Sequence, residues 1–148
     1  MIALLQRVRR ASVEVDSRIV AEIGRGLLVF IGIEPADDGS VSEKLLQRLL
    51  HYRLFEDGTG RMNLSLQHLE RGAGGLLLVP QFTLAARTDS GNRASFSSAA
   101  PPAVARLVFQ DLVERATNRW PQTSSGEFGS EMLVSLVNDG PVTFLLRS

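Results

Sequence analysis

Two short and almost uninterrupted apolar runs constrain the fold of this chain more than any other feature. Residues 26–33 read GLLVFIGI, and residues 75–79 read GLLLV. Both runs consist of residues compatible with β-structure, and a strand that is apolar on both faces is typical of the centre of a sheet. The chain is therefore predicted to fold around a sheet in which these two runs are buried, central strands.

The segment before the first apolar run predicts a pair of further strands. Residues 2–15 suit a long strand, because apolar and polar side chains alternate toward its end. Residues 16–18, which read DSR, suit a turn, and the IVAEIG that follows suits the returning strand. Residues 55–75, by contrast, are rich in turn-forming residues and are expected to be irregular.

Two helices are predicted from the periodicity of apolar residues. The first runs from about 41 to 54, because Ser40 and Glu43 have the spacing of a capping box. Its apolar face is predicted to comprise Val41, Leu45, Leu46, Leu49, Leu50 and Leu54. The second helix begins at Pro102, since proline is favoured in a first helical turn. Its inner face is predicted to comprise Val104, Leu107, Val108, Leu112 and Ala116.

Two connections in the second half of the chain are unusual. The first, NDGP, is flanked by strand-like runs at 132–137 and 142–146, and Asp-Gly in such a place predicts a closing hairpin. Pro141 fits this hairpin poorly, because proline lacks the N–H that a paired strand uses. The second connection, residues 80–102, is long for a structureless link in a small domain, which makes it a candidate functional loop.

These elements together predict one α/β domain that spans residues 1–148. The chain has 148 residues, of which 44% are hydrophobic, and this suffices for one sizeable core. The expected architecture is a strongly curved, barrel-like mixed β-sheet with two main helices packed on it.

The composition excludes several kinds of site. Cysteine is absent, so disulfides, thiolate nucleophiles and Cys-bound zinc are excluded. The two histidines, His51 and His68, are scattered and suit neither a Ser-His-Asp triad nor a zinc site, and neither metal nor cofactor is expected. The formal net charge is zero, which gives no global field toward nucleic acid. No apolar stretch approaches a membrane span and the first residues lack a signal-peptide layout, so a soluble, cytoplasmic protein is expected.

This scarcity of acid–base groups limits the chemistry of any enzyme built from this chain. Such an enzyme would use main-chain donors, a few hydroxyl groups and help from its substrate. Those means suffice only for an intrinsically labile bond, such as an activated ester.

Four stretches carry a resemblance to a known family. In chain order they read MIALLQRVRRASVEV, GRMNLSL, PQFTLAA and VNDGPVTF. Over essentially the whole chain, and without large insertions, this pattern resembles the D-aminoacyl-tRNA deacylase family, which removes D-amino acids mistakenly esterified to tRNA. The resemblance implies a hydrolase that cleaves the ester of D-aminoacyl-tRNA, binds the 3′ end of the tRNA and has no role at DNA or membranes.

The resemblance also implies roles for two groups of residues. Gly140 and Pro141 match the family's Gly-cis-Pro motif, which enters the pocket of the partner subunit in a homodimer and rejects L-amino acids by collision with their Cβ. Glycine has no Cβ, so mischarged glycyl-tRNA is an expected second substrate. Arg7 resembles the arginine that supports this motif.

The second group is Gln81, Phe82 and Thr83, which match the family's other signature. The N–H groups of Gln81 and Phe82 are expected to form an oxyanion hole for the ester carbonyl. Thr83 either supports this loop or orients water, and a purely structural threonine remains an alternative. The 2′-hydroxyl of the terminal ribose of the tRNA is expected to assist the attack.

One position departs from the family pattern. Residue 80 is proline, where the second signature normally has serine. A related, chirality-relaxed animal branch also has Pro-Gln here, although NDGPVT resembles the main branch. The alternatives are therefore a chirality-relaxed deacylase, a domain that binds charged tRNA ends without hydrolysis, and an unrelated small-molecule hydrolase that uses Thr83.

Overall fold

The strand β1, Ile2–Val15, is the element on which the sheet is assembled. The computed structural model describes residues 1–70, 74–89 and 91–148. In it, β1 pairs antiparallel with β2 (Arg18–Ile23) and β3 (Gly26–Gly32) along one edge and with β8 (Leu133–Arg147) along the other. The length of β1 allows it to pair with three other strands.

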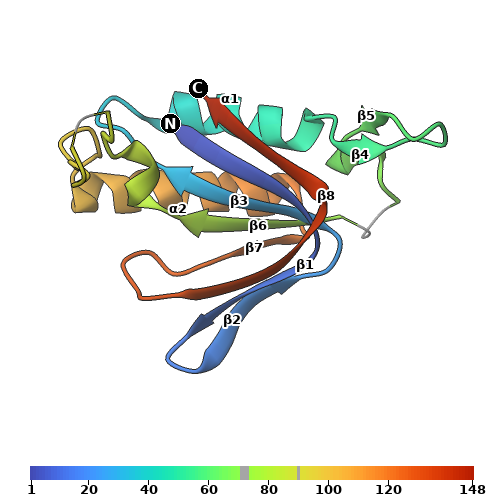
Figure 1. Ribbon diagram of the computed structural model, residues 1–148, viewed down its shortest axis with the longest axis horizontal. Helices are drawn as coiled ribbons and strands as arrows, with labels where there is room; N and C mark the ends of the chain where they lie inside the picture. The colour runs from blue at the N-terminus through green and yellow to red at the C-terminus, as the bar shows by residue number, and fades with distance from the viewer. Residues whose placement is uncertain (71–73, 90) are drawn as a thin grey trace.

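The remaining strands make the sheet mixed. Strand β6, Gly75–Pro80, runs parallel to β3, and the short β7, Thr123–Ser125, runs parallel to β6. Leu27 and Leu28 of β3 and Leu77 of β6 are fully buried, as expected for central strands. The predicted architecture is confirmed, because the sheet curls into a nearly closed, barrel-like form that carries two helices (Figure 1).

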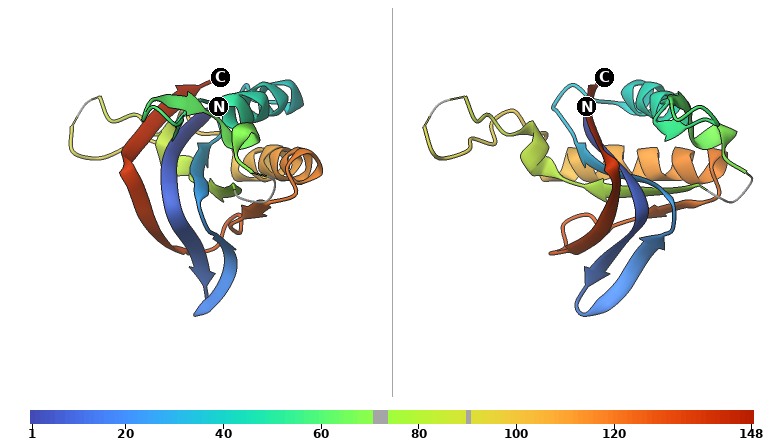
Figure 2. Two further views of the ribbon diagram at one scale, coloured as in Figure 1. Left: turned by 90° about the vertical axis from the view of Figure 1, so that its right-hand side faces the viewer. Right: turned by 45° about the vertical axis from the view of Figure 1, so that its right-hand side comes forward.

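The two helices lie side by side on the same face of the sheet (Figures 1 and 2). They are α1, Gly39–His51, and α2, Pro102–Arg119. The leucines of α1 and the apolar side of α2 pack against β3 and β6 in the main core. A second apolar cluster fills the concave side of the curled sheet and includes Val8, Val13, Ile23, Leu28 and Leu77. Burial on both faces explains why β3 and β6 are apolar throughout.

Helix α1 starts and ends earlier than the sequence predicts. Its N-cap is Asp38, not Ser40, because Asp38 Oδ1 accepts hydrogen bonds from the N–H groups of Ser40 and Val41 at 2.9 and 3.1 Å. These hydrogen bonds also hold the pKa of Asp38 below its ordinary value, with the Ser40 side chain as the largest cause. At the other end Tyr52 is extended, so the predicted end at residue 54 is three residues too late.

The inner face of α2 is also rotated relative to the prediction. The buried side chains are Ala105, Phe109, Leu112 and Ala116, whereas Val104 and Leu107 are exposed. Apolar residues occupy nearly the whole circumference of the first half of this helix, so periodicity alone does not select one face. Phe109 decides the orientation, because it is the largest of these side chains and packs in the main core.

The region predicted to be irregular contains a small hairpin. Strands β4, Phe55–Glu56, and β5, Met62–Leu64, pair antiparallel, and a 3₁₀ turn η1 follows at Leu66–His68. Residues 71–73 of that region lie outside the described residues. The candidate loop after β6 begins with a second 3₁₀ turn, η2, at Phe82–Ala85, and its residue 90 also lies outside the description.

The C-terminal hairpin prediction is wrong. Both predicted strands belong to β8 and run in the same direction along β1, with residues 133–138 beside the second half of β1 and residues 143–147 beside the first half. The sequence of each half of β8 resembles one strand of a hairpin, but β1 is long enough to pair with both halves in succession. The NDGP link is therefore an interruption within one strand and not a turn between two.

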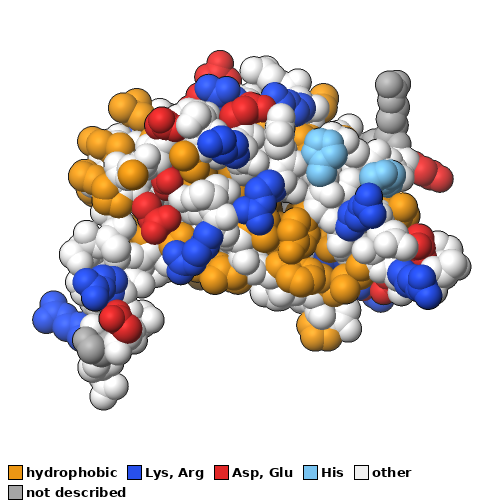
Figure 3. Space-filling model, turned by 90° about the horizontal axis from the view of Figure 1, so that it is seen from above, with side chains coloured by type: hydrophobic (Ala, Val, Ile, Leu, Met, Phe, Trp, Pro, Cys, Tyr) orange, Lys and Arg blue, Asp and Glu red, His pale blue; other side chains and the backbone are white. Residues whose placement is uncertain are grey.

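The surface and helices add two further observations. Figure 3 shows basic and acidic side chains interspersed over the face seen from above, without an extended field of one sign. Among the described residues, no helix combines the length and the apolar character needed to cross a membrane.

The orientation of α2 gives a direct test of the fold. Phe109 is 3% exposed and Leu107 is 67% exposed. Phe109→Ala is expected to lower the free energy of unfolding by about 3–5 kcal/mol through lost packing. Leu107→Ala is the matched control and is expected to change it by less than about 0.5 kcal/mol. Urea denaturation measures both, and the reverse order of effects would contradict the observed face.

Candidate active site

The NDGP link forms a bulge in β8. Gln6 of β1 pairs with Thr143 and Val8 pairs with Asn138, so the four residues 139–142 lie opposite the single residue Arg7. The Gly140–Pro141 peptide bond is cis, and Gly140 has a φ of +138°, a backbone conformation that favours glycine. The bulge thus places exposed Gly140 and Pro141 outside the regular ladder.

Arg7 holds the bulge from the opposite strand. Its side chain is buried, and Nε donates to the carbonyl oxygen of Asp139 at 2.9 Å. Nη1 donates to the carbonyl oxygen of Leu54 at 2.7 Å, and Nη2 lies 3.5 Å from Glu56 Oε1. A buried guanidinium requires such partners, because its desolvation is costly. Arg7 therefore joins the bulge to the start of the β4–β5 hairpin.

The hairpin beside Arg7 is itself fixed by hydrogen bonds. Asp57 accepts from the Thr59 hydroxyl at 2.6 Å and from Asn63 Nδ2 at 2.6 Å. These bonds, with those from the N–H groups of Thr59 and Arg61, hold the pKa of Asp57 well below its ordinary range. The turn that follows Glu56 is consequently well defined by its own side chains.

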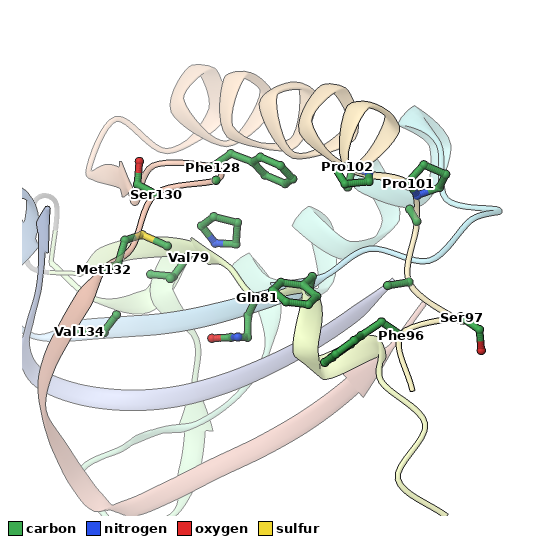
Figure 4. Close-up of a pocket in the computed structure, with 16 residues that line it drawn as sticks. Val79, Gln81, Phe96, Ser97, Pro101, Pro102, Phe128, Ser130, Met132 and Val134 are labelled. Carbon is green, nitrogen blue, oxygen red and sulfur yellow. The ribbon is translucent and has the colours of Figure 1, made fainter. Parts of the chain in front are cut away.

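A cavity of about 760 Å³ lies at the other functional signature. Figure 4 shows it between the first turns of α2, the end of β6 and the segment that leads into β8. Its walls are largely apolar, with Phe96 and Phe128 on opposite sides and Met132 and Val134 beside the sheet. The other residues that line it are Val79, Pro80, Gln81, Phe82, Ser97, Ala99, Ala100, Pro101, Pro102, Ala105, Gly129 and Ser130.

Two aromatic contacts shape this cavity. The rings of Phe82 and Phe96 are tilted against one another with centroids 5.0 Å apart. On the other wall, the guanidinium of Arg106 lies 5.1 Å from the centroid of the Phe128 ring, a cation–π arrangement. The residues from 96 to 134 that complete the walls were not identified from the sequence individually. Two features of the sequence indicated a site in the 80–102 connection, its unusual length and the PQFTLAA signature, and neither extends to the wall residues after 102.

The main chain around η2 supplies donors, but not the pair that was expected. The N–H of Gln81 donates to the carbonyl oxygen of Ile31 at 2.7 Å and is therefore engaged in the sheet. The first hydrogen bond of η2 runs from Leu84 N to Gln81 O, so the N–H groups of Phe82 and Thr83 precede the bonded part of the turn. The expectation that the Gln81 N–H is a free oxyanion donor is corrected accordingly.

Side chains of the same segment are coupled to each other. Gln81 Nε2 donates to Thr83 Oγ1 at 2.5 Å, and Thr83 is exposed. Pro80 is the last residue of β6, paired with Ile31 and in the wall of the cavity. Proline suits the end of a strand, where a missing N–H costs no internal ladder bond.

The lining of the cavity contains hydroxyl, amide and apolar side chains but, within the part of the chain that is described, no titratable side chain. No group of three or more His, Asp or Glu residues that could hold a metal ion occurs in residues 1–70, 74–89 and 91–148. The polar groups that the described lining offers are therefore main-chain groups, the amide of Gln81 and the hydroxyls of Ser97 and Ser130.

The two sets of site residues do not meet within one chain. Arg7 lies against Gly140 and the rest of the bulge, while Gln81 and Phe82 line the cavity. None of residues 139–142 belongs to the cavity wall. In Figure 1 the bend in β8 lies toward β4 and β5, and the segment after β6 lies at the opposite end of the sheet.

Comparisons with known proteins place the chain in a family. The model of the D-Tyr-tRNA(Tyr) deacylase family matches residues 4–147. D-aminoacyl-tRNA deacylases of Pseudomonas aeruginosa (strain LESB58) and Azotobacter vinelandii (strain DJ / ATCC BAA-1303) are each 57% identical to this chain over 148 residues, with 100% of both chains covered. The chain belongs to the D-Tyr-tRNA(Tyr) deacylase family. It is an enzyme of the hydrolase class.

Solved structures share the fold. A structure described as c-Myc DNA Unwinding Element Binding Protein matches with a TM-score of 0.90 and 34% sequence identity, covering 100% of this chain and 99% of that one. A probable eukaryotic D-amino acid tRNA deacylase matches with a TM-score of 0.86, covering 98% of this chain and 97% of that one. At 17% identity the second likeness shows the fold alone.

The geometry of Gly140 yields a prediction for activity. A Cβ at this position would lie 2.6 Å from Val142 Cγ2 and 3.0 Å from Val142 N. Gly140→Ala is therefore expected to displace the bulge, since backbone strain of a non-glycine residue in such a region costs of order 1–3 kcal/mol. The expected result is a fall of at least about tenfold in kcat/KM for deacylation of D-tyrosyl-tRNA.

Gly58→Ala is the matched control for this variant. A Cβ at Gly58 would meet no atom within 4 Å, so this variant is expected to retain activity. Steady-state kinetics and circular dichroism on both variants make the comparison. An active Gly140→Ala enzyme with unchanged kcat/KM would show that the shape of the bulge is unimportant.

Proposed function

We propose that this protein hydrolyses the ester bond of D-aminoacyl-tRNA and rejects L-aminoacyl-tRNA, in the cytoplasm and as an editing step of translation. The observation that carries the proposal is the bulge at residues 139–142, held opposite Arg7 by the hydrogen bond to Asp139. It is a rigid main-chain element at the motif that the family resemblance connects with chirality.

The proposed hydrolysis uses the main chain around η2. The N–H groups of Phe82 and Thr83 donate to the ester carbonyl and stabilise the negative charge that develops on its oxygen. The Thr83 hydroxyl, held by Gln81, orients the nucleophile or supports the loop. The 2′-hydroxyl of the terminal ribose assists the attack, which agrees with a cavity wall without titratable groups in the described residues.

The proposed selection of chirality uses the carbonyl groups of Gly140 and Pro141. They accept hydrogen bonds from the α-amino group of the substrate, and the Cβ of an L-amino acid collides with them. Such a filter acts on the Cα configuration and not on the identity of the side chain. Glycyl esters pass it because glycine has no Cβ, so mischarged glycyl-tRNA is a second proposed substrate.

The proposed enzyme is a homodimer in which each bulge enters the cavity of the partner. Two observations support this arrangement. Gly140 and Pro141 lie apart from the cavity of their own chain. Strand β8 also pairs only with β1 among the described strands and exposes Leu133 and Leu145, which leaves an open apolar edge for a second copy.

Pro80 is the basis of two competing functions. Because the chirality-relaxed branch has Pro-Gln at this point, a deacylase that accepts L-substrates is the second candidate. A domain that binds charged tRNA ends without hydrolysis is a third, since the serine hydroxyl of the family signature is missing. We favour strict D-selectivity, because residues 138–143 read NDGPVT and resemble the main branch of the family.

The ligand is proposed to be an RNA end and not DNA or a membrane. The name of the structure at 34% identity refers to DNA, and that activity belongs to that protein. The apolar cavity instead suits one nucleoside with its attached amino acid.

The deciding experiment compares D-tyrosyl-tRNA with L-tyrosyl-tRNA, using the purified protein in EDTA. The expected kcat/KM for the D-substrate exceeds that for the L-substrate at least about 100-fold, which corresponds to a difference of about 2.7 kcal/mol in barrier. Similar rates for both would favour the chirality-relaxed candidate. Binding of D-tyrosyl-tRNA without turnover would favour the non-catalytic candidate, and a lack of both would overturn the proposed function.

A further inference from the structure

Asn138 is the last residue of β8 that pairs with β1 before the bulge, and its side-chain amide spans the base of that bulge. Asn138 Oδ1 accepts a hydrogen bond from Val142 N at 2.8 Å. Asn138 Nδ2 donates to the carbonyl oxygen of Val142 at 3.3 Å. Both polar main-chain groups of Val142 are therefore bonded by one side chain.

This arrangement replaces a strand partner that Val142 lacks. Residues 139–142 have only Arg7 opposite them, so the sheet offers Val142 no residue with which to pair. A carboxamide has the same donor and acceptor as a peptide group, and it can therefore bond an N–H and a C=O at once. Asn138 closes the bulge into a loop whose two ends are fixed to each other.

A hydroxyl group fixes the same amide to the neighbouring strand. Asn138 Nδ2 also donates to Thr143 Oγ1 at 3.2 Å. Gln6 Nε2, from β1, donates to the same oxygen at 3.2 Å. Thr143 thus links the amide of Asn138 to the residue of β1 with which Thr143 is paired.

The two halves of the bulge are consequently held by different residues. Arg7 binds the carbonyl oxygen of Asp139 in the first half, and Asn138 binds Val142 in the second half. Gly140 and Pro141 lie between these two attachments. Both attachments therefore flank the peptide groups of Gly140 and Pro141 directly.

We propose that the side-chain amide of Asn138, held by Thr143, positions the carbonyl groups of Gly140 and Pro141 and thereby sets the discrimination between D- and L-aminoacyl esters. The inference rests on the proposed function. Asn138 is a positioning residue, since it acts through the bulge and not on the reacting atoms. Loss of its amide would widen the range of directions available to the two carbonyl groups, which would admit the Cβ of an L-amino acid.

The first test is Asn138→Asp. The aspartate keeps an acceptor for Val142 N, but it replaces the donor Nδ2 by a second oxygen that faces the carbonyl of Val142. The expected result is a fall of at least about tenfold in the ratio of kcat/KM for D-tyrosyl-tRNA over L-tyrosyl-tRNA, equal to about 1.4 kcal/mol. Asn118→Asp, on the exposed surface of α2, makes the same chemical change elsewhere and is expected to leave the ratio unaltered.

The rate of glycyl-tRNA hydrolysis distinguishes a positioning role of Asn138 from a merely structural one. Glycine has no Cβ to reject, so its hydrolysis is expected to change in parallel with that of the D-substrate. Hydrolysis of the L-substrate alone is expected to rise relative to both. An equal loss of rate on all three substrates would identify a structural residue and overturn the inference.

The pair Thr143→Val and Thr143→Ser keeps the inference testable if Asn138→Asp does not fold. Valine removes the hydroxyl group at nearly constant volume, and serine retains it. We expect relaxed selectivity in the valine variant and wild-type selectivity in the serine variant. If the wild-type enzyme is selective and the D-to-L ratio of Thr143→Val stays within about twofold of the wild-type ratio, the inference is overturned and the proposed function is not. A wild-type protein that does not hydrolyse D-tyrosyl-tRNA would instead overturn the proposed function.

Discussion

The contact between the Arg7 guanidinium and the bulge of β8 is the interaction on which the rest of the structure depends. Strand β1 pairs with β8 almost along its whole length, and the largest interruption of the ladder is where Arg7 faces four residues. Without a buried donor at that position, the carbonyl groups of Asp139 and Leu54 would lose their partners, which is costly in a protein interior. The hydrogen bonds of Arg7 therefore stabilise one conformation of the bulge at residues 139–142.

The main chain has an unusually large share in the proposed chemistry. The described cavity wall has no titratable side chain, and the donors near it are N–H groups at the start of η2. Main-chain groups that neighbouring hydrogen bonds hold in place can be preorganised toward a developing charge or a chiral centre. Such a site is suited to an activated ester, whose cleavage needs orientation more than strong acid–base catalysis.

The sequence predicted the features that depend on local patterns. The buried strands β3 and β6, the long β1 and both helices follow from apolar runs, alternation and turn residues. Features that depend on distant partners were not predictable in this way. NDGP reads as a hairpin until the length of β1 is known, and the inner face of α2 is decided by where Phe109 packs. The cavity walls combine residues 79–105 with residues 128–134, which only the fold brings together.

The central claim is that a bulge from one chain and a cavity from another form the site, and a heterodimer tests it most directly. One chain carries Gly140→Ala, and the other carries Ala99→Trp, which fills the cavity wall. Each homodimer should retain at most about a tenth of the wild-type activity. The purified heterodimer should recover about half of the wild-type activity, because one of its two sites combines an intact bulge with an intact cavity. A heterodimer as inactive as either homodimer would contradict a site shared between two chains.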